Sequence, residues 1–177
     1  MKGKKQLMQL AFASALGGAI AGGAVLMTAE PANAQAAYGS YVGVGAAIGL
    51  SSDADTGDGA NFAGVISGRY RFLRIPVSIR AQAFIFGDGF ALVPTVSYDY
   101  PLNWNTDIYL GAGLSFSSGD DPSPVGDRTA FVLQPGVDYI FPNSRLTLFG
   151  NAVIAFNGYR DGGNTAVSLQ GGVGYQF

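Results

Sequence analysis

Four segments of the chain end in one aromatic pattern, in which the last residue and the residue two positions before it are Tyr or Phe. They are residues 68–72 (GRYRF), 96–100 (VSYDY), 137–141 (VDYIF) and 173–177 (VGYQF). Because side chains alternate between the two faces of a β-strand, both rings of each segment project from one face. The pattern predicts four strands that carry a belt of rings at one end of a shared face.

The length of this face indicates a membrane. A second ring lies ten residues before the last one in three of the segments, at Phe62, Phe90 and Phe131, and Val167 holds this position in the fourth. Ten steps of roughly 3.3 Å along a strand tilted by about 40° rise by roughly 25 Å, the height of the apolar band of an outer-membrane barrel. The face carries no charged residue, so we expect it to contact lipid.

The closing rings are predicted to lie at a membrane interface. Trp104, the only tryptophan, lies in the predicted turn 101–105 and is expected to anchor the same interface. Docking of a periplasmic partner on Trp104 is the alternative. The predicted interface residues are Tyr70, Phe72, Tyr98, Tyr100, Trp104, Tyr139 and Phe141.

Four more apolar or alternating runs separate the closing strands, at residues 41–50, 77–86, 107–116 and 145–156. The connections alternate between short turns and longer segments rich in Asp and Gly, as in barrels with tight periplasmic turns and longer outward loops. The sequence thus predicts an all-β fold, an eight-stranded antiparallel up-and-down transmembrane β-barrel. Pro94 and Pro135, 41 residues apart in a repeated hairpin, are expected to interrupt the hydrogen-bond ladder locally.

The first 34 residues have the features of a secretory signal peptide. Three lysines precede an Ala/Gly/Leu-rich run, and small residues at Ala32 and Ala34 mark a cleavage site before Gln35. A retained transmembrane helix is the alternative. We therefore expect residues 1–34 to be removed and residues 35–177 to form one barrel domain.

Residues 35–177 contain seven arginines, eleven aspartates and no Lys, Glu, His or Cys, a net charge of −4. Without cysteine an exported chain cannot use disulfides, so closure of the ladder must stabilise it. The acidic balance argues against a nucleic-acid partner. A soluble barrel with an apolar ligand cavity is the rival fold, but its exterior would normally carry Lys and Glu, and its small interior would be overfilled by this many rings.

The strand count, the aromatic belts and the terminal VGYQF resemble the small eight-stranded outer-membrane β-barrel proteins, the OmpA/OmpX-like and opacity-protein-like group. The resemblance covers residues 35–177. It implies location in the outer membrane after export through the periplasm, contact with outer-membrane lipid, and a monomer. It also implies that Val173, Tyr175 and Phe177 form the signal that the barrel-assembly machinery recognises during biogenesis.

The face opposite the lipid face carries charges of both signs in its periplasmic half. We predict that they form a hydrogen-bonded Arg/Asp network that plugs the lumen, since isolated charges would be costly there. A gate or narrow ion path with the same residues is the alternative. The predicted cluster consists of Arg69, Arg71, Arg80, Asp99, Asp107, Asp138 and Arg145.

The outward half of the lumen is predicted to be small and apolar, either packed or forming a shallow pocket for an apolar molecule. It consists of Val65, Ala91, Val93, Ala130, Val132, Val153 and Ala155. Phe84, Tyr109 and Phe149 are expected to fill the space that lumen glycines leave.

Little in the sequence favours catalysis. Without His, Glu, Cys or Lys in residues 35–177, only Asp, Tyr and Ser remain for acid–base or nucleophilic work. Residues 53–59 (DADTGDG) resemble a calcium loop but lack the acidic residue at position twelve, where Gly64 stands, so we expect a solvated outer loop, with a low-affinity divalent site as the alternative. We therefore predict no catalytic residue, no cofactor and no metal site, and a structural or surface-interaction role in envelope integrity or adhesion. A narrow channel or apolar-solute conduit is the second hypothesis, and a lipid-modifying enzyme the third.

Overall fold

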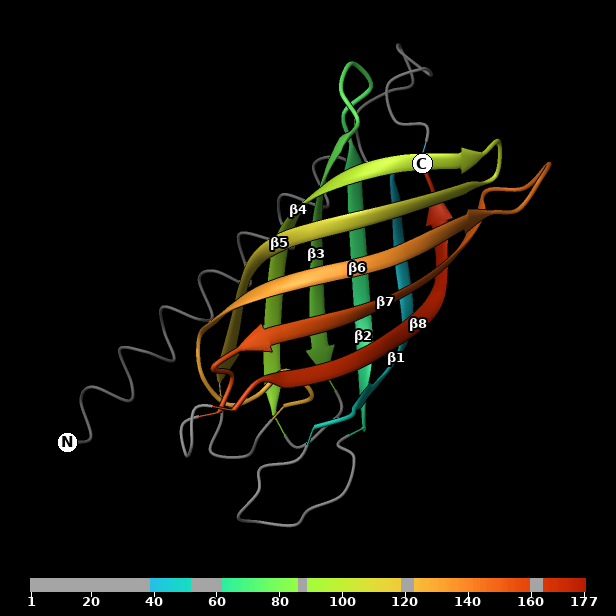
Figure 1. The fold of residues 1–177 in the computed structure, drawn as a ribbon. Helices are drawn as coiled ribbons and strands as arrows, with labels where there is room; N and C mark the ends of the chain where they lie inside the picture. Colours follow the sequence, from blue (N-terminus) through green and yellow to red (C-terminus); the bar gives the residue numbers. More distant parts are fainter. Residues whose placement is uncertain (1–38, 52–61, 86–88, 119–122, 160–163) are drawn as a thin grey trace, which may run out of the picture. The chain divides into compact units, whose positions relative to one another are not determined.

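The structure is a computed structural model that describes residues 39–51, 62–85, 89–118, 123–159 and 164–177. These residues form eight strands that close into an antiparallel barrel in the order β1 to β8, with β8 paired to β1 (Figure 1). The strands are β1 (Tyr41–Gly49), β2 (Phe62–Arg71), β3 (Val77–Ile85), β4 (Phe90–Asn103), β5 (Thr106–Ser118), β6 (Ala130–Ile140), β7 (Leu146–Phe156) and β8 (Ala166–Gln176). The predicted fold is confirmed.

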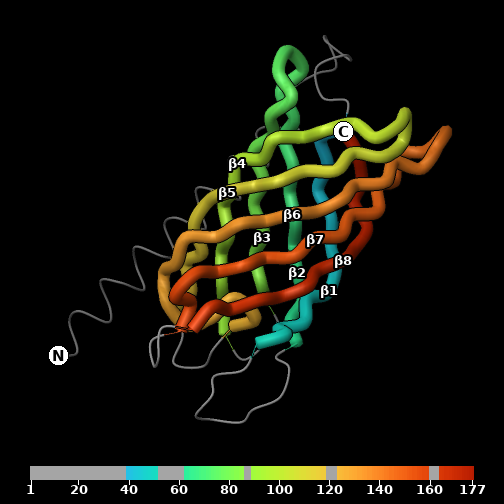
Figure 2. The backbone as a smooth tube through the Cα atoms, viewed as in Figure 1, coloured from blue at the N-terminus to red at the C-terminus, as the bar shows by residue number. Residues whose placement is uncertain are grey.

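Each strand pairs only with its neighbours in sequence, except where β1 meets β8 along nine residue pairs from Tyr41↔Gln176 to Gly49↔Ser168. The strands are steeply tilted, and the front wall crosses the rear wall at a large angle (Figure 2). Such tilt accompanies closure of a sheet. We call the end with the β2–β3, β4–β5 and β6–β7 turns and the C-terminus the turn end, and the other the loop end (Figure 1).

The predicted signal peptide, residues 1–34, and the calcium-like segment 53–59 lie outside the described residues. Among the residues that the structure describes, no helix has the length and hydropathy needed to span a membrane.

The β4–β5 connection is tighter than predicted. Instead of a turn over residues 101–105, β4 continues to Asn103 and β5 begins at Thr106, so that Trp104 and Asn105 alone reverse the chain. Asn103 stabilises this turn because its side-chain Oδ1 accepts a hydrogen bond of 2.9 Å from the Asn105 backbone N–H. The register shifts between Pro101 and Asn103, which places a bulge at Leu102.

Both strand prolines interrupt one ladder and leave the other intact, as predicted. Pro94 stays paired with Ala81 of β3, but the β4–β5 pairing is interrupted between Leu92 and Thr95. Pro135 stays paired with Leu110 of β5, and the β6–β7 pairing is interrupted between Leu133 and Gly136. Since a proline ring has no N–H to donate, each strand loses local bonds without changing its register.

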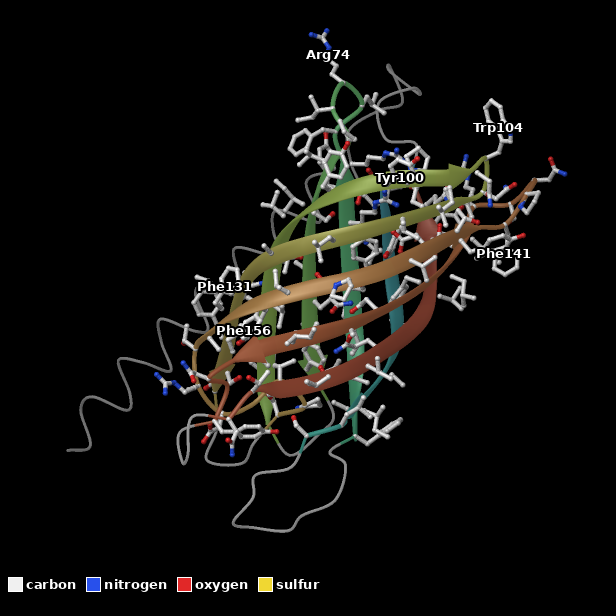
Figure 3. All side chains as sticks on the ribbon, in the orientation of Figure 1. Arg74, Tyr100, Trp104, Phe131, Phe141 and Phe156 are labelled. Atoms are coloured by element: carbon white, nitrogen blue, oxygen red, sulfur yellow. The ribbon has the colours of Figure 1, made fainter. Side chains whose placement is uncertain are left out.

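The ring-bearing faces point outward. Tyr98, Tyr139 and Tyr175 are 59%, 37% and 55% exposed, which excludes the soluble barrel with these rings inside. Tyr100, Phe141 and Trp104 lie toward the turn end, and Phe131 and Phe156 lie nearer the loop end (Figure 3). The exterior therefore carries two aromatic belts separated by apolar side chains, which is the surface a lipid bilayer requires.

Inside the barrel, large rings lie against glycines of neighbouring strands. A Cβ added at Gly172 would lie 2.6 Å from Phe149 Cζ, and one at Gly174 would lie 2.6 Å from Tyr41 Cδ2. A Cβ at Gly136 would overlap the Tyr109 ring. Two of the three predicted space-filling rings, Tyr109 and Phe149, thus occupy space that glycines leave. Phe84 is instead buried in the apolar cluster of the loop-end half.

Candidate functional site: a sealed, charged lumen

Arg69 on β2 is the centre of a buried ion network in the turn-end half of the lumen. Its guanidinium donates to Asp99 on β4 at 3.0 Å, to Asp107 on β5 at 3.0 Å and to Asp138 on β6 at 2.9 Å. Its Nε donates to Ser78 Oγ at 3.2 Å. One side chain therefore reaches three acidic groups on three strands across the lumen.

Arg80 on β3 forms the second half of the network. It donates to Asp99 at 3.1 Å and to Asp138 at 2.8 Å. Its guanidinium carbon lies 3.3 Å from the centre of the Tyr109 ring, a cation–π contact. Tyr41 closes this side by donating its hydroxyl to Asp138 Oδ1 at 3.0 Å.

Arg71 completes the charge balance at the rim of the network. It donates to Asp107 at 2.7 Å, with 21% of its side chain exposed. Three arginines thus face three aspartates, and Asp99 also accepts hydrogen bonds from the hydroxyls of Ser78 and Ser97. Neutral balance and full hydrogen bonding are what allow charges to lie in a lumen that lipid surrounds.

Six of the seven predicted cluster residues are brought together, and the seventh is not. Arg145 precedes β7, is exposed, and makes no salt bridge within the described part of the chain. Its guanidinium lies 3.5 Å from the hydroxyl of the outward-facing Tyr175. The prediction that Arg145 belongs to the lumen cluster is wrong, because the β6–β7 turn ends only at this residue and directs its side chain outward.

A layer of amides lies next to the ion network. Gln134 Nε2 donates to Gln82 Oε1 at 2.9 Å and to Asn151 Oδ1 at 3.2 Å, while its own Oε1 accepts from Thr95 Oγ1 at 2.6 Å. These four residues come from β3, β4, β6 and β7. The layer therefore cross-links opposite walls at mid-height.

The loop-end half of the lumen is an apolar core. All seven predicted residues of this half belong to one buried cluster, which also contains Phe84. Val125 and Tyr159, from the β5–β6 and β7–β8 loops, belong to it as well and are 0% and 3% exposed. These side chains favour the packed interpretation of this half over an open pocket.

Val125 reaches the cluster because its loop folds back over the barrel mouth. Ser123 and Gly126 exchange two backbone hydrogen bonds of 3.1 and 2.9 Å and close a turn around Pro124 and Val125. Gly126 has a φ of +96°, which disfavours any residue with a Cβ. The turn docks on the β7–β8 loop, where the Gly158 carbonyl accepts from the Asp127 and Arg128 N–H groups.

Tyr159 is held by the beginning of the β1–β2 loop. Its hydroxyl donates to the Ser51 carbonyl at 2.8 Å and lies 3.2 Å from Ser51 Oγ. Ser51 Oγ in turn accepts from the Val167 N–H at 2.8 Å. We call the Ser123–Gly126 turn together with Tyr159 and Ser51 the outer cap. Sequence reasoning missed it, although an S-P-V-G turn inside an acidic loop was the available signal.

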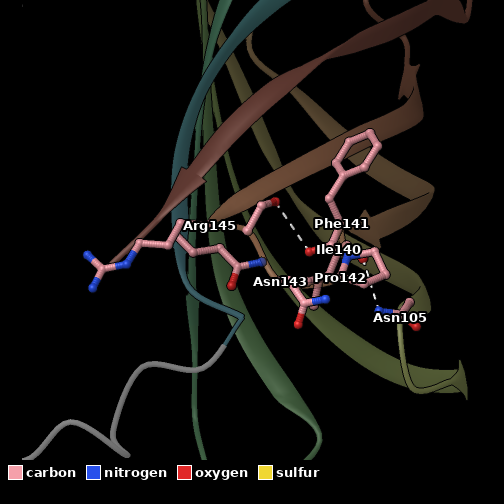
Figure 4. Close-up of a pocket in the computed structure, with 8 residues that line it drawn as sticks. Asn105, Ile140, Phe141, Pro142, Asn143 and Arg145 are labelled. Carbon is pink, nitrogen blue, oxygen red and sulfur yellow. Dashed lines mark hydrogen bonds between the residues drawn. The ribbon is translucent and has the colours of Figure 1, made fainter.

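One cleft of about 440 Å³ lies at the turn end, between the β4–β5 and β6–β7 turns (Figure 4). It is lined mainly by amides and apolar groups, with an Asn105–Ile140 hydrogen bond of 3.1 Å at its side. The Arg145 side chain points away from Asn105 and Phe141 (Figure 4). The cleft thus combines uncharged polar and apolar groups with one cation, Arg145, at its edge.

No protein-family model matches the chain, and no curated protein matches it. Solved structures do match the chain. Neisserial surface protein A (NspA) superposes with a TM-score of 0.55 at 21% identity, covering 81% of this chain and 100% of that one. A de novo designed transmembrane β-barrel gives a TM-score of 0.53 at 12% identity, covering 78% and 96%.

The attachment invasion locus protein Ail of Yersinia pestis, solved with the heparin analogue sucrose octasulfate, gives a TM-score of 0.49 at 15% identity, covering 78% and 97%. The first two structures establish the fold, which is that of small eight-stranded membrane-spanning barrels. The predicted resemblance to outer-membrane barrels is confirmed at this level, and the apolar exterior with its belts agrees with the predicted location in the outer membrane.

Proposed function

We propose that the protein is a closed outer-membrane barrel that acts through its surface, in envelope integrity or adhesion, rather than by transport. One observation carries the proposal: the lumen is occupied along its whole height. The ion network fills the turn-end half, the amide layer the middle, and the apolar cluster with the outer cap the loop-end half.

A narrow channel is the competing function, because charged side chains line part of the lumen. For ions to pass, the salt bridges of Arg69 and Arg80 would have to open and the buried Val93, Val132 and Val153 would have to separate. Removing one partner of a buried ion pair costs about 3–5 kcal/mol because the other charge is left uncompensated, and separating these pairs would expose charges in the same way. The packed state therefore favours a barrel that does not conduct.

Planar-bilayer recording tests the proposal. We expect no sustained conductance from the wild-type protein, and none from Arg74→Ala, which removes an exposed arginine outside the network. Sustained wild-type conductance that changes in Arg80→Ala and stays unchanged in Arg74→Ala would contradict the proposal and show that the network lines an ion path.

The surface role is supported by where the charge of the sequence lies. Asp99, Asp107 and Asp138 are paired inside the barrel, whereas in the sequence the other eight aspartates fall between β1 and β2, β3 and β4, β5 and β6, or β7 and β8. NspA, whose fold the chain shares, is described as a surface protein. Cells that carry the protein should adhere to a test surface to a different extent from cells that carry a variant with its loop aspartates replaced by Asn. Both kinds of cell should contain equal amounts of heat-modifiable barrel on gels.

We also propose that the protein is not an enzyme. Every described lumen aspartate is engaged by arginine, so none is available as a general base. Wild-type protein in phospholipid vesicles should release no fatty acid or lysolipid. Turnover above that of empty vesicles would favour the lipid-modifying alternative.

Assembly and oligomeric state are part of the same proposal. Val173 and Tyr175 face outward on β8 and Phe177 directly follows the strand, and all three side chains are exposed, which supports their recognition by the barrel-assembly machinery before closure. Replacing Phe177 by Ser should lower the amount of heat-modifiable barrel in cells without changing refolding of purified chain into detergent. We expect a monomer in light scattering of the detergent-solubilised barrel.

A further inference from the structure

Three buried polar atoms in the middle of the lumen make no hydrogen bond of good geometry among the described residues, although the Tyr109 side chain lies close enough to Asn151 to interact with it. They are the hydroxyl of Tyr109 on β5, Nδ2 of Asn151 on β7 and Oε1 of Gln170 on β8. The three residues are only 5%, 7% and 5% exposed. Buried polar atoms in native proteins are nearly always paired, so three orphan atoms need an explanation.

The three residues lie along one row of backbone pairs, which begins where Tyr109 of β5 pairs with Gly136 of β6. Asn151 pairs directly with Gly136 of β6 on one side and with Gln170 of β8 on the other. The Tyr109 ring passes over Gly136, where an added Cβ would lie 2.5 Å from the Tyr109 hydroxyl and 2.7 Å from Asn151 Cβ. The hydroxyl therefore ends beside the Asn151–Gln170 pair.

The hydrogen bonds that these side chains already make determine whether each unpaired atom is a donor or an acceptor. Asn151 uses its Oδ1 to accept from Gln134 at 3.2 Å, so its Nδ2 remains as a donor. Gln170 uses its Nε2 to donate to Ser168 Oγ at 2.6 Å, so its Oε1 remains as an acceptor. Tyr109 is clamped by the Arg80 guanidinium on its ring, and its hydroxyl can donate or accept.

One donor, one acceptor and one hydroxyl together determine which kind of ligand fits the site. A cation would be repelled by the N–H groups of Asn151, and an anion by the carbonyl oxygen of Gln170. A molecule that both donates and accepts satisfies all three atoms at once, and water commonly makes three such bonds when it is buried. We infer that Tyr109, Asn151 and Gln170 hold one ordered water molecule, which accepts from Asn151, donates to Gln170 and bonds the Tyr109 hydroxyl.

The water site lies at the boundary between the polar and the apolar half of the lumen. On the inward face of β7, Asn151 stands between Phe149 and the fully buried Val153, where the polar half of the lumen meets the apolar cluster. The bound water extends the polar half to this boundary and no further. Exchange of the water with solvent must then pass the ion network at the turn end, because the apolar cluster and the outer cap close the loop end.

Nuclear magnetic resonance on the refolded barrel tests the site directly. In the wild-type protein, we expect a cross-peak between the water resonance and the side-chain amide protons of Asn151. Tyr109→Phe keeps the ring on Arg80 but removes one of the three partners, and should weaken the cross-peak and lower the melting temperature. Ser115→Ala removes a lumen hydroxyl in the apolar half and should leave the cross-peak unchanged.

A second pair of variants tests the site independently if Tyr109→Phe folds poorly. Gln170→Leu alone removes the acceptor of one water proton, whereas Asn151→Leu with Gln170→Leu removes both the donor and the acceptor that hold the water beside Tyr109. The double variant should therefore melt at a higher temperature than the sum of the single effects predicts. The absence of a water cross-peak in the wild-type protein, with Asn151 bonded directly to the Tyr109 hydroxyl in a high-resolution crystal structure, would overturn the proposal.

Discussion

Replacing Arg69 by Met should destabilise the barrel more than any other single substitution of an arginine. The side chain donates to three aspartates and to Ser78, and it is 2% exposed. Met fills a similar volume without charge, so the variant leaves three aspartates opposite the two arginines Arg71 and Arg80. The network then carries one uncompensated negative charge inside a lumen that lipid surrounds.

The size of the stability loss follows from the ion pairs that remain in the Arg69→Met variant. Asp99 and Asp138 keep their bonds to Arg80, and Asp107 keeps its bond to Arg71. No aspartate is left without a cation, so the loss is that of one broken buried pair rather than three. We expect the free energy of unfolding to fall by about 3–5 kcal/mol.

Urea unfolding of the barrel in lipid vesicles, followed by circular dichroism and by gel mobility with and without boiling, measures this difference. Arg74→Met is the matched control, since Arg74 lies exposed in the β2–β3 turn (Figure 3). Asp107→Asn on the Arg69→Met background restores neutrality and should be less destabilising than the sum of the two single changes, by about 1–3 kcal/mol. Equal stability of Arg69→Met and Arg74→Met would refute the view that the network stabilises the barrel.

Three further predictions concern closure, the membrane interface and the outer cap. Gly172→Ala should prevent formation of heat-modifiable barrel, because its Cβ would meet the backbone of β1, whereas Gly68→Ala has open space around its Cβ and should fold normally. Trp104, which is 94% exposed, should show blue-shifted fluorescence in vesicles and stronger quenching by lipids brominated near the headgroup than deep in the chain; emission as in water would contradict the interface anchor. A cysteine at Val125 should resist maleimide in the otherwise unchanged protein and react once Tyr159→Phe removes the bond to Ser51; equal reactivity in both would exclude the outer cap as a seal.

The strands and their faces were predictable from the sequence because a membrane barrel imposes period two and a fixed height on every strand. The outward position of Tyr98 follows from those two constraints, and the local effect of Pro94 follows from its missing N–H. The β4–β5 turn was predicted too long, because β4 continues through Pro101 to Asn103. Pro101 lies beside a bulge near the end of the ladder, where a missing N–H does little harm.

Contacts across the lumen are a different problem, and they explain why the site was only partly predictable. Register fixes which residues are neighbours along the wall, but Arg69 on β2 binds Asp138 on β6, which lies far around the barrel. Such a contact depends on side-chain length and on the space that glycines leave, as where the Tyr109 ring crosses Gly136 to reach Asn151. In a barrel this narrow, a long side chain that points inward reaches the opposite wall, so charges of opposite sign at similar height are forced into one network. The sequence therefore predicts that a network forms and which charges are near it, whereas the individual pairs require the packing of the whole lumen.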